Sequence, residues 1–123
     1  MKQFDILLVD DEERFANMLA KRLQLRGIDC QVCYNGKQAL EIVKQEKFFL
    51  VLLDLHLPDI YGTEVLAQIK SHDAQVPVII LTGHGTENDR EICMNYGAYA
   101  FIHKPLRIDK LISIMEQIGE KAS

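Results

Sequence analysis

Four short apolar runs place the strongest constraint on the fold of this chain. They are ILLV at 6–9, LVLL at 50–53, VPVIILT at 76–82 and YAFI at 99–102. Continuous apolar runs of this length are typical of strands that are buried on both faces, as in parallel sheets covered by helices. A fifth segment, IDCQVC at 28–33, is more mixed and suits an edge strand. The sequence therefore predicts five strands.

Helical patterns lie between these strands. Apolar residues at helical spacing mark one face in each of four segments: Phe15, Met18, Leu19 and Leu23; Ala39, Leu40 and Val43; Val65, Leu66 and Ile69; and Ile108, Leu111, Ile112, Met115 and Ile118. Glycines and prolines fall at or near the expected helix ends and strand starts. Strands that alternate with helices in this way predict an α/β fold, a doubly wound (βα)5 parallel sheet with helices on both faces.

Length and charge narrow the class of protein. A chain of 123 residues is the size of one compact domain, which we expect to span residues 1–123. A formal net charge of −4 argues against a nucleic-acid surface, which needs clustered lysine and arginine. No apolar run approaches the roughly 18 residues that a membrane span needs. We therefore expect a cytoplasmic protein that binds neither nucleic acid nor a membrane.

Two cysteines raise the alternative of a zinc or redox site. Cys30 and Cys33 form a C-x-x-C pattern, but they fall in the expected edge strand. Residues three apart in a strand point to opposite faces, so this pair is poorly placed to share a metal. With Cys93 as the remaining cysteine, we expect buried free thiols in a reducing compartment.

Polar residues follow four of the five expected strands. Asp10 and Asp11 follow the first, Asp54 follows the third, Thr82 ends the fourth and Lys104 follows the fifth. Each of them alone could have a structural role, such as capping the next helix. Because the carboxyl ends of parallel strands meet at one edge of a sheet, we expect these side chains to form a common site.

The chemistry of that site follows from its residue types. Crowded carboxylates repel one another, and they supply the hard oxygen ligands that Mg²⁺ requires. A carboxylate nucleophile that attacks a phosphoryl group needs positioning and charge neutralisation, which a divalent cation and a lysine provide. A threonine hydroxyl can hydrogen-bond the new phosphoryl oxygens. The sequence predicts a carboxylate that accepts a phosphoryl group in a Mg²⁺-dependent reaction.

Four motifs carry a resemblance to a known family over nearly the whole chain. LLVDDE, LLDLHLPDIYG, VIILTG and AFIHKP occur in this order, and the sequence resembles response-regulator receiver domains of two-component signalling. The resemblance implies a flavodoxin-like sheet with strand order 2-1-3-4-5. Its motifs TGHGT and GAYAFIHKP look most like receivers of sigma-54-dependent activators. A stand-alone receiver and the receiver part of a longer regulator both remain open.

The resemblance also implies roles for individual residues. Asp54 would be the phosphoacceptor, Asp11 and the backbone carbonyl of His56 direct Mg²⁺ ligands, and Asp10 the residue that holds the waters of the metal. Thr82 and Lys104 would contact the phosphoryl group, Phe101 would be the switch partner of Thr82, and the bond before Pro105 would be cis. A plain core position for Phe101 is the alternative.

Three residues beside the site vary in this family and are candidates for setting the lifetime of the phosphorylated form. Gly83 leaves the phosphoryl group open, whereas His56 and His84 would either order the attacking water or shield the phosphate from it. Two departures, Ile60 and Tyr61, are expected to alter surface contacts and to leave the chemistry alone.

The expected function is a signalling switch rather than an enzyme with other substrates. A sensor histidine kinase or a phosphotransfer protein would phosphorylate Asp54. An output domain, a partner or a second copy in a homodimer would then bind the face formed by the fourth helix, fifth strand and fifth helix. One alternative is a haloacid-dehalogenase-like phosphatase, which places an aspartate where His56 stands and carries a cap domain. Another is a phosphorylation-independent binding module of the same fold.

Overall fold

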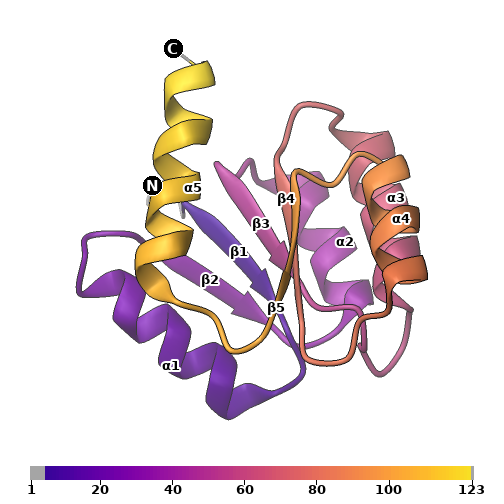
Figure 1. Cartoon of the computed structure of the whole chain (residues 1–123), viewed down its shortest axis with the longest axis horizontal. Coiled ribbons are helices and arrows are strands. Elements are labelled where there is room, and N and C mark those ends of the chain that lie inside the picture. The colour runs from indigo at the N-terminus through magenta and orange to yellow at the C-terminus, as the bar shows by residue number, and fades with distance from the viewer. Residues whose placement is uncertain (1–4, 123) are drawn as a thin grey trace.

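The computed structural model describes residues 5–122, in which strands and helices alternate along the chain (Figure 1). The ends of the expected domain, residues 1–4 and 123, lie outside the described residues. The elements are β1 (Ile6–Val9), α1 (Glu13–Gln24), β2 (Cys30–Cys33), α2 (Gly36–Gln45), β3 (Leu50–Leu53), α3 (Gly62–His72), β4 (Val78–Thr82), α4 (Glu87–Asn95), β5 (Ala100–His103) and α5 (Ile108–Ala122). All five expected strands form; β1 and β3 have the expected bounds, and the bounds of β2, β4 and β5 differ from the expected segments by one or two residues.

The strands make one parallel sheet in the order β2-β1-β3-β4-β5, which confirms the predicted flavodoxin-like topology. The register explains how the site is assembled. Val9 of β1 pairs with Leu53 of β3, so that Asp10 and Asp54 follow at the same level of the sheet. At the other side, Thr82 of β4 pairs with His103 of β5, and Lys104 comes next. Adjacent strands thus end together and deliver their polar residues to one edge.

Helices cover both faces of the sheet (Figure 1). α1 and α5 lie on one face and α2, α3 and α4 on the other. Side chains of β3 alternate between the two cores: Leu50 and Leu52 pack toward α1 and α5, and Val51 and Leu53 toward α2 and α3. All four are at most 1% exposed, which explains why the strand has no polar position. Burial on both faces holds the end of β3 rigidly.

One residue of the predicted helical faces is less buried than expected. Met18 lies on the same side of α1 as Leu19 but is 48% exposed, whereas Leu19 and Leu23 are buried. Its place at the rim of the helix face, beside a surface cavity that Phe15 and Leu106 also line, accounts for this exposure.

Within residues 5–122, the structure contains no helix with the length and apolar character to cross a bilayer.

The edge strand β2 settles the question raised by its cysteines. Cys30 packs on the core under α1 and α5, and Cys33 on the opposite core. Both are free thiols, as is Cys93. Burial raises the pKa of Cys30 and of Cys33 to about 12, so both thiols stay protonated near neutral pH. Cys33 and Cys93 are buried as predicted, whereas Cys30 is half-buried.

The loop from β3 to α3 is fixed by two contacts. The Asp59 carboxylate accepts hydrogen bonds from the backbone N–H groups of Gly36 (2.8 Å), Lys37 (2.9 Å) and Ile60 (2.9 Å) and so caps the start of α2. Desolvation opposes its charge, but these N–H groups prevail and lower the pKa of Asp59. Gly62 lies so close that an added Cβ would stand 2.6 Å from the Asp54 carbonyl oxygen. The loop therefore turns tightly directly after Asp54.

Replacing Asp59 tests how much this loop contributes to stability. Asp59→Ala removes two backbone hydrogen bonds at the start of α2 and one within the loop, and we expect the free energy of unfolding to fall by about 1–2 kcal/mol. Urea denaturation of the parent and variant measures it. Glu41→Ala, which removes an exposed carboxylate from the middle of α2, is the matched control and should change stability by less than about 0.5 kcal/mol. Equal effects of the two changes would contradict the capping role.

Candidate functional site

Three carboxylates meet at the carboxyl ends of β1 and β3. Oxygens of Asp10, Glu12 and Asp54 all lie within 4.8 Å of one another. Asp10 is 1% and Asp54 4% exposed, whereas Glu12 is exposed. The group lies where chain connections leave β1 for one side of the sheet and β3 for the other, which is the usual ligand position in open α/β sheets.

Lys104 places a positive charge among these carboxylates. Its Nζ is 2.8 Å from Asp10 Oδ2, 2.8 Å from Glu12 Oε1 and 3.7 Å from Asp54 Oδ2. It also stands 4.3 Å from the centre of the Phe15 ring. Burial opposes the ammonium charge, but hydrogen bonds to Asp10 and Glu12 prevail and raise the pKa of Lys104. The peptide bond that follows, Lys104–Pro105, is cis, as the resemblance implied.

The charge balance of the site favours a further cation. Burial raises the pKa of Asp10, although hydrogen bonds from Lys104 and from the Glu12 N–H (2.9 Å) counteract it, and the neighbouring Asp54 adds repulsion. Two buried carboxylates and one exposed carboxylate form a set of hard oxygen donors around a single ammonium group. Such a donor set fits Mg²⁺, which takes carboxylate oxygens together with waters and phosphate oxygens.

The predicted carboxylate set and the observed group differ in one member. Asp10 and Asp54 lie together as expected, but among the described residues the third grouped carboxylate is Glu12 rather than Asp11. Asp11 is exposed at the entrance to α1, and its role as a metal ligand stays a prediction. The sequence signal for Glu12 was present in the DDEE run, because residue 12 is two positions beyond Asp10 and its long side chain can turn back to the edge of the sheet.

Thr82 is fully buried and touches the loop that leads into α4. Its Oγ1 accepts a hydrogen bond from the His84 N–H at 3.4 Å. A Cβ added to Gly85 would lie 2.7 Å from Thr82 Cγ2 and 2.6 Å from Phe101 Cζ. Only a glycine allows both side chains to approach the backbone there, so Gly85 joins Thr82 to the Phe101 ring. Sequence reasoning missed Gly85, because its neighbours come from another strand.

The two histidines form a bridge across the site between two loops. His56 Nε2 donates to the His84 backbone carbonyl over 2.9 Å, which requires a proton on Nε2. The His56 ring meets the rings of Tyr61 and His84 edge to face, with centroids 5.5 Å and 6.0 Å away. On the other side of Thr82, Gly83 is open: the nearest atom to an added Cβ is Lys104 Cδ at 3.9 Å.

Tyr61 extends this bridge to α4. Its hydroxyl donates to Asp89 Oδ1 at 3.0 Å, and the second oxygen of Asp89 accepts from Thr86 in the capping box that starts α4. Partial burial and the Asp89 carboxylate raise the pKa of Tyr61 to about 12. The sequence predicted altered surface contacts at Tyr61, and the structure identifies the contact. It tethers the loop after Asp54 to the helix after Thr82.

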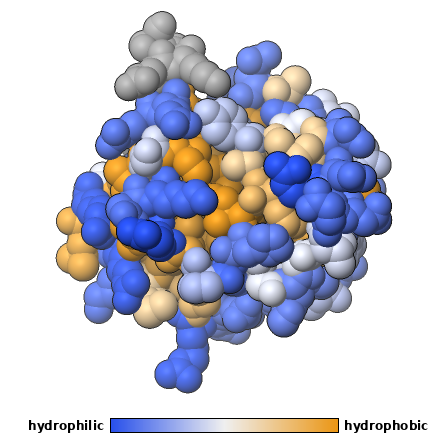
Figure 2. Space-filling model, in the orientation of Figure 1, coloured by the Kyte–Doolittle hydropathy of each residue, from blue (hydrophilic) through white to orange (hydrophobic). Residues whose placement is uncertain are grey.

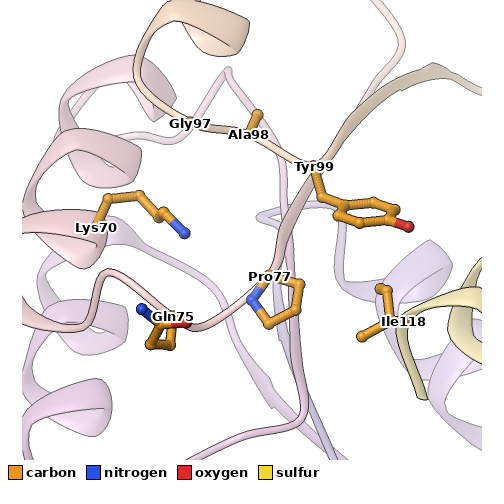
Figure 3. Close-up of a pocket in the computed structure, with 7 residues that line it drawn as sticks. All are labelled: Lys70, Gln75, Pro77, Gly97, Ala98, Tyr99 and Ile118. Atoms are coloured by element: carbon orange, nitrogen blue, oxygen red, sulfur yellow. The ribbon is translucent and has the colours of Figure 1, made fainter. Parts of the chain in front are cut away.

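Two cavities lie at opposite ends of the sheet. One of about 490 Å³ opens beside the carboxylates and is lined by Glu12, Phe15, Gly83, His84 and Lys104 among others. The other, of about 470 Å³, lies before the start of β4 and β5 (Figure 3). There Lys70 donates to the backbone carbonyls of Ala74 (2.8 Å) and Val76 (2.9 Å) and so fixes a loop. The cavity near the carboxylates is the one placed for chemistry.

The comparisons with known proteins agree with this geometry. The family of response regulator receiver domains matches residues 6–116, and the chain belongs to this family. It is therefore a receiver domain of the two-component type. An NtrX-like response regulator of Rickettsia typhi is 38% identical over 98% of this chain, and the chain spans 26% of the length of that relative.

Solved structures support the same assignment. A CheY-like receiver domain from Methanospirillum hungatei superposes with a TM-score of 0.91 at 29% identity, covering 98% of both chains. The receiver domain of NtrX from Brucella abortus has a TM-score of 0.85 and 32% identity, over 94% of this chain and 98% of that one. The similarity to receivers of the NtrX and sigma-54 activator type matches the resemblance in the sequence.

Proposed function

We propose that this domain accepts a phosphoryl group on Asp54 from a sensor histidine kinase or a phosphotransfer protein and then switches a partner surface. The position of Asp54 carries the proposal. This carboxylate is 4% exposed, stands at the end of a strand buried on both faces, and is grouped with two other carboxylates and one lysine. A nucleophile held so firmly can be aimed at a donor without a large loss of entropy.

The transfer itself is a single displacement at phosphorus. An Asp54 oxygen forms a bond to phosphorus while the bond to the donor's imidazole nitrogen breaks, and the imidazole takes its proton from solvent. Mg²⁺ would neutralise charge on the phosphoryl oxygens, held by Asp11, Asp54 and the His56 carbonyl, with Asp10 on its waters. Lys104 and Thr82 would take the remaining phosphoryl oxygens. Asp10 and Glu12 keep Lys104 protonated for this purpose.

We propose that a donor approaches Asp54 from the cavity of about 490 Å³, which is lined by Glu12 and Lys104, two residues that are grouped with Asp54. It lies between α1 and the turn after β5, with Lys104 at one wall and the half-exposed Met18 at another. An apolar rim beside a lysine suits a protein partner that presents a phosphohistidine. We place the sensor kinase or phosphotransfer protein on this side of the domain.

Membership of the receiver family counts against a haloacid-dehalogenase-like phosphatase, and the complete set of Asp54, Thr82 and Lys104 counts against a module that ignores phosphate. The domain would catalyse only its own phosphorylation and dephosphorylation. We place this unit, residues 1–123, in the cytoplasm, which agrees with its free cysteines.

The contact of Thr82, Gly85 and Phe101 supports an output surface on α4, β5 and α5. Figure 2, in the orientation of Figure 1, shows apolar residues gathered over β5, between α4 and α5, within a polar surround. Phe101 belongs to this strand and is half-buried against Gly85. A phosphoryl group that draws Thr82 toward Asp54 would unpack this contact. The resulting surface would take an output domain, a separate partner or a second copy of the chain.

The histidine bridge supports a role in the lifetime of the phosphorylated form. Water must reach phosphorus in line with the bond to Asp54, and we propose that the His56 ring, which is bonded to the His84 carbonyl, covers one of its approaches. Gly83 leaves the neighbouring approach open. The His56–His84 bridge therefore shields the phosphoryl group from water, and the open space at Gly83 limits this shielding.

The first prediction concerns the phosphoacceptor. Incubation with acetyl phosphate and Mg²⁺ should add one phosphoryl group to the parent and none to Asp54→Asn, because the amide cannot act as the nucleophile. Intact-mass spectrometry measures both, with an EDTA sample to test the cation. Glu41→Gln, which changes an exposed carboxylate of α2 outside the site, should be phosphorylated like the parent. Equal phosphorylation of Asp54→Asn, or of the EDTA sample, would refute the assignment.

The second prediction concerns the switch. Thr82→Ala should still bind beryllofluoride at Asp54, but its amide NMR shifts on α4, β5 and α5 should be much smaller than those of the parent, because the hydroxyl that senses the phosphoryl group is gone. Ser71→Ala, which removes an exposed hydroxyl near the far end of α3, is the control and should give shifts like those of the parent. Shifts of equal size on that face in Thr82→Ala and the parent would rule out the coupling.

The third prediction concerns lifetime. His56→Ala should lose its phosphoryl group several-fold faster than the parent after the donor is removed, and Gly83→Ala should lose it more slowly, because there is room for the added methyl group. Phosphoprotein remaining with time is followed by mass spectrometry. His72→Ala, a change at the far end of α3, should decay like the parent. Slower decay in His56→Ala would mean that the ring positions water instead.

A further inference from the structure

The hydrogen bonding of Lys104 is divided unequally among its three carboxylates. An ammonium group has three donors, and two of them meet Asp10 and Glu12 at 2.8 Å each. The distance to Asp54, 3.7 Å, is too long for a hydrogen bond. The residue that must contact a phosphoryl group on Asp54 is therefore held by two other partners.

We infer that Glu12 is a positioning residue. In the resting protein it holds the Lys104 ammonium beyond hydrogen-bond distance of Asp54, and it releases the ammonium when a phosphoryl group arrives. This inference rests on the proposed phosphorylation of Asp54. It assigns Glu12 a role in timing the availability of the lysine, in addition to any contact with a metal ion.

Burial explains why Glu12, and not Asp10, gives way. The Glu12 side chain is 61% exposed, so water can replace the ammonium as its partner at small cost. The Asp10 side chain is 1% exposed, and losing its cation would leave a buried charge unpaired. The pKa of Glu12 is lowered by its hydrogen bond to Lys104, in keeping with a stable contact in the resting state.

The incoming group supplies the force that breaks the contact. A phosphoryl group on Asp54 carries about 2 negative charges where the free carboxylate carried one, and it brings strong acceptor oxygens. Lys104 needs to shift its Nζ only slightly from its present 3.7 Å to bond them. The Phe15 ring lies 4.3 Å from the ammonium nitrogen itself, and the adjoining cavity of about 490 Å³, which Glu12 lines, gives the freed Glu12 side chain room to move outward.

Glu12→Gln should therefore speed phosphorylation by acetyl phosphate. The amide keeps the shape of the side chain but removes the charge that holds Lys104. Because Glu12 is exposed, loss of its ion pair with Lys104 should raise the phosphorylation rate by about two- to fivefold. Glu13→Gln is the matched control, since it removes the same charge from the next residue, an exposed position in the first turn of α1. Rates are measured at saturating Mg²⁺, with the Mg²⁺ affinity determined by NMR titration.

A second readout follows the lysine directly and needs no phosphorylation. The Lys104 ammonium should give a slowly exchanging ¹H–¹⁵N signal in the resting parent protein, assigned by its loss in Lys104→Arg. Glu12→Gln should shift or broaden that signal, and Glu13→Gln should not. Because this experiment uses the unphosphorylated protein, it still tests the contact if Asp54 proves not to be the phosphoacceptor.

The outcomes separate the alternatives. A changed ammonium signal together with faster phosphorylation supports the holding role of Glu12. An unchanged signal overturns it, and so does slower phosphorylation with weaker Mg²⁺ affinity, which would make Glu12 a metal ligand first. Equal acceleration by Glu13→Gln would also overturn it, because general charge repulsion of the anionic donor would then explain the rate.

Discussion

The close approach of Asp10 and Asp54 at the end of two buried strands is the constraint on which the rest of the site depends. Pairing of Val9 with Leu53 forces the two carboxylates to the same level, where neither is more than 4% exposed. Such a pair cannot stay charged in a poorly hydrated place without cations nearby. Lys104 neutralises part of this negative charge, and the remaining charge favours a divalent ion.

Side-chain hydrogen bonds join the loops around this charge cluster to one another and to the helices beside them. Asp59 joins the loop after β3 to α2, and Tyr61 joins the same loop to Asp89 of α4. His56 adds a hydrogen bond to the loop after β4. Two sets of contacts therefore connect the surroundings of Asp54 with the start of α4: this tether, and the packing of Thr82 against the Gly85 backbone.

The sequence predicted the sheet, and the edge of the sheet at which Asp10, Asp54 and Lys104 meet, because both depend on patterns along single strands. Continuous apolar runs identified the buried strands, and the polar residue after each run identified the site. Contacts that join different loops had no such signal. Glu12, and not Asp11, belongs to the observed carboxylate group because its longer side chain reaches back to the end of the sheet. The need for glycine at position 85 comes from the Phe101 ring, which belongs to β5. Met18 is exposed because its helix face ends at a cavity.

Phosphorylation of such a site would redistribute charge in two directions at once. The negative charge added at Asp54 would attract Lys104, which follows β5, on the α1 side, and Thr82, which ends the neighbouring strand β4, on the α4 side. Movement of the lysine frees Glu12 into solvent beside the donor cavity, and movement of the threonine acts on the Phe101 packing. The surface that receives the phosphoryl group and the surface that reports it would then change together, although different residues carry each change.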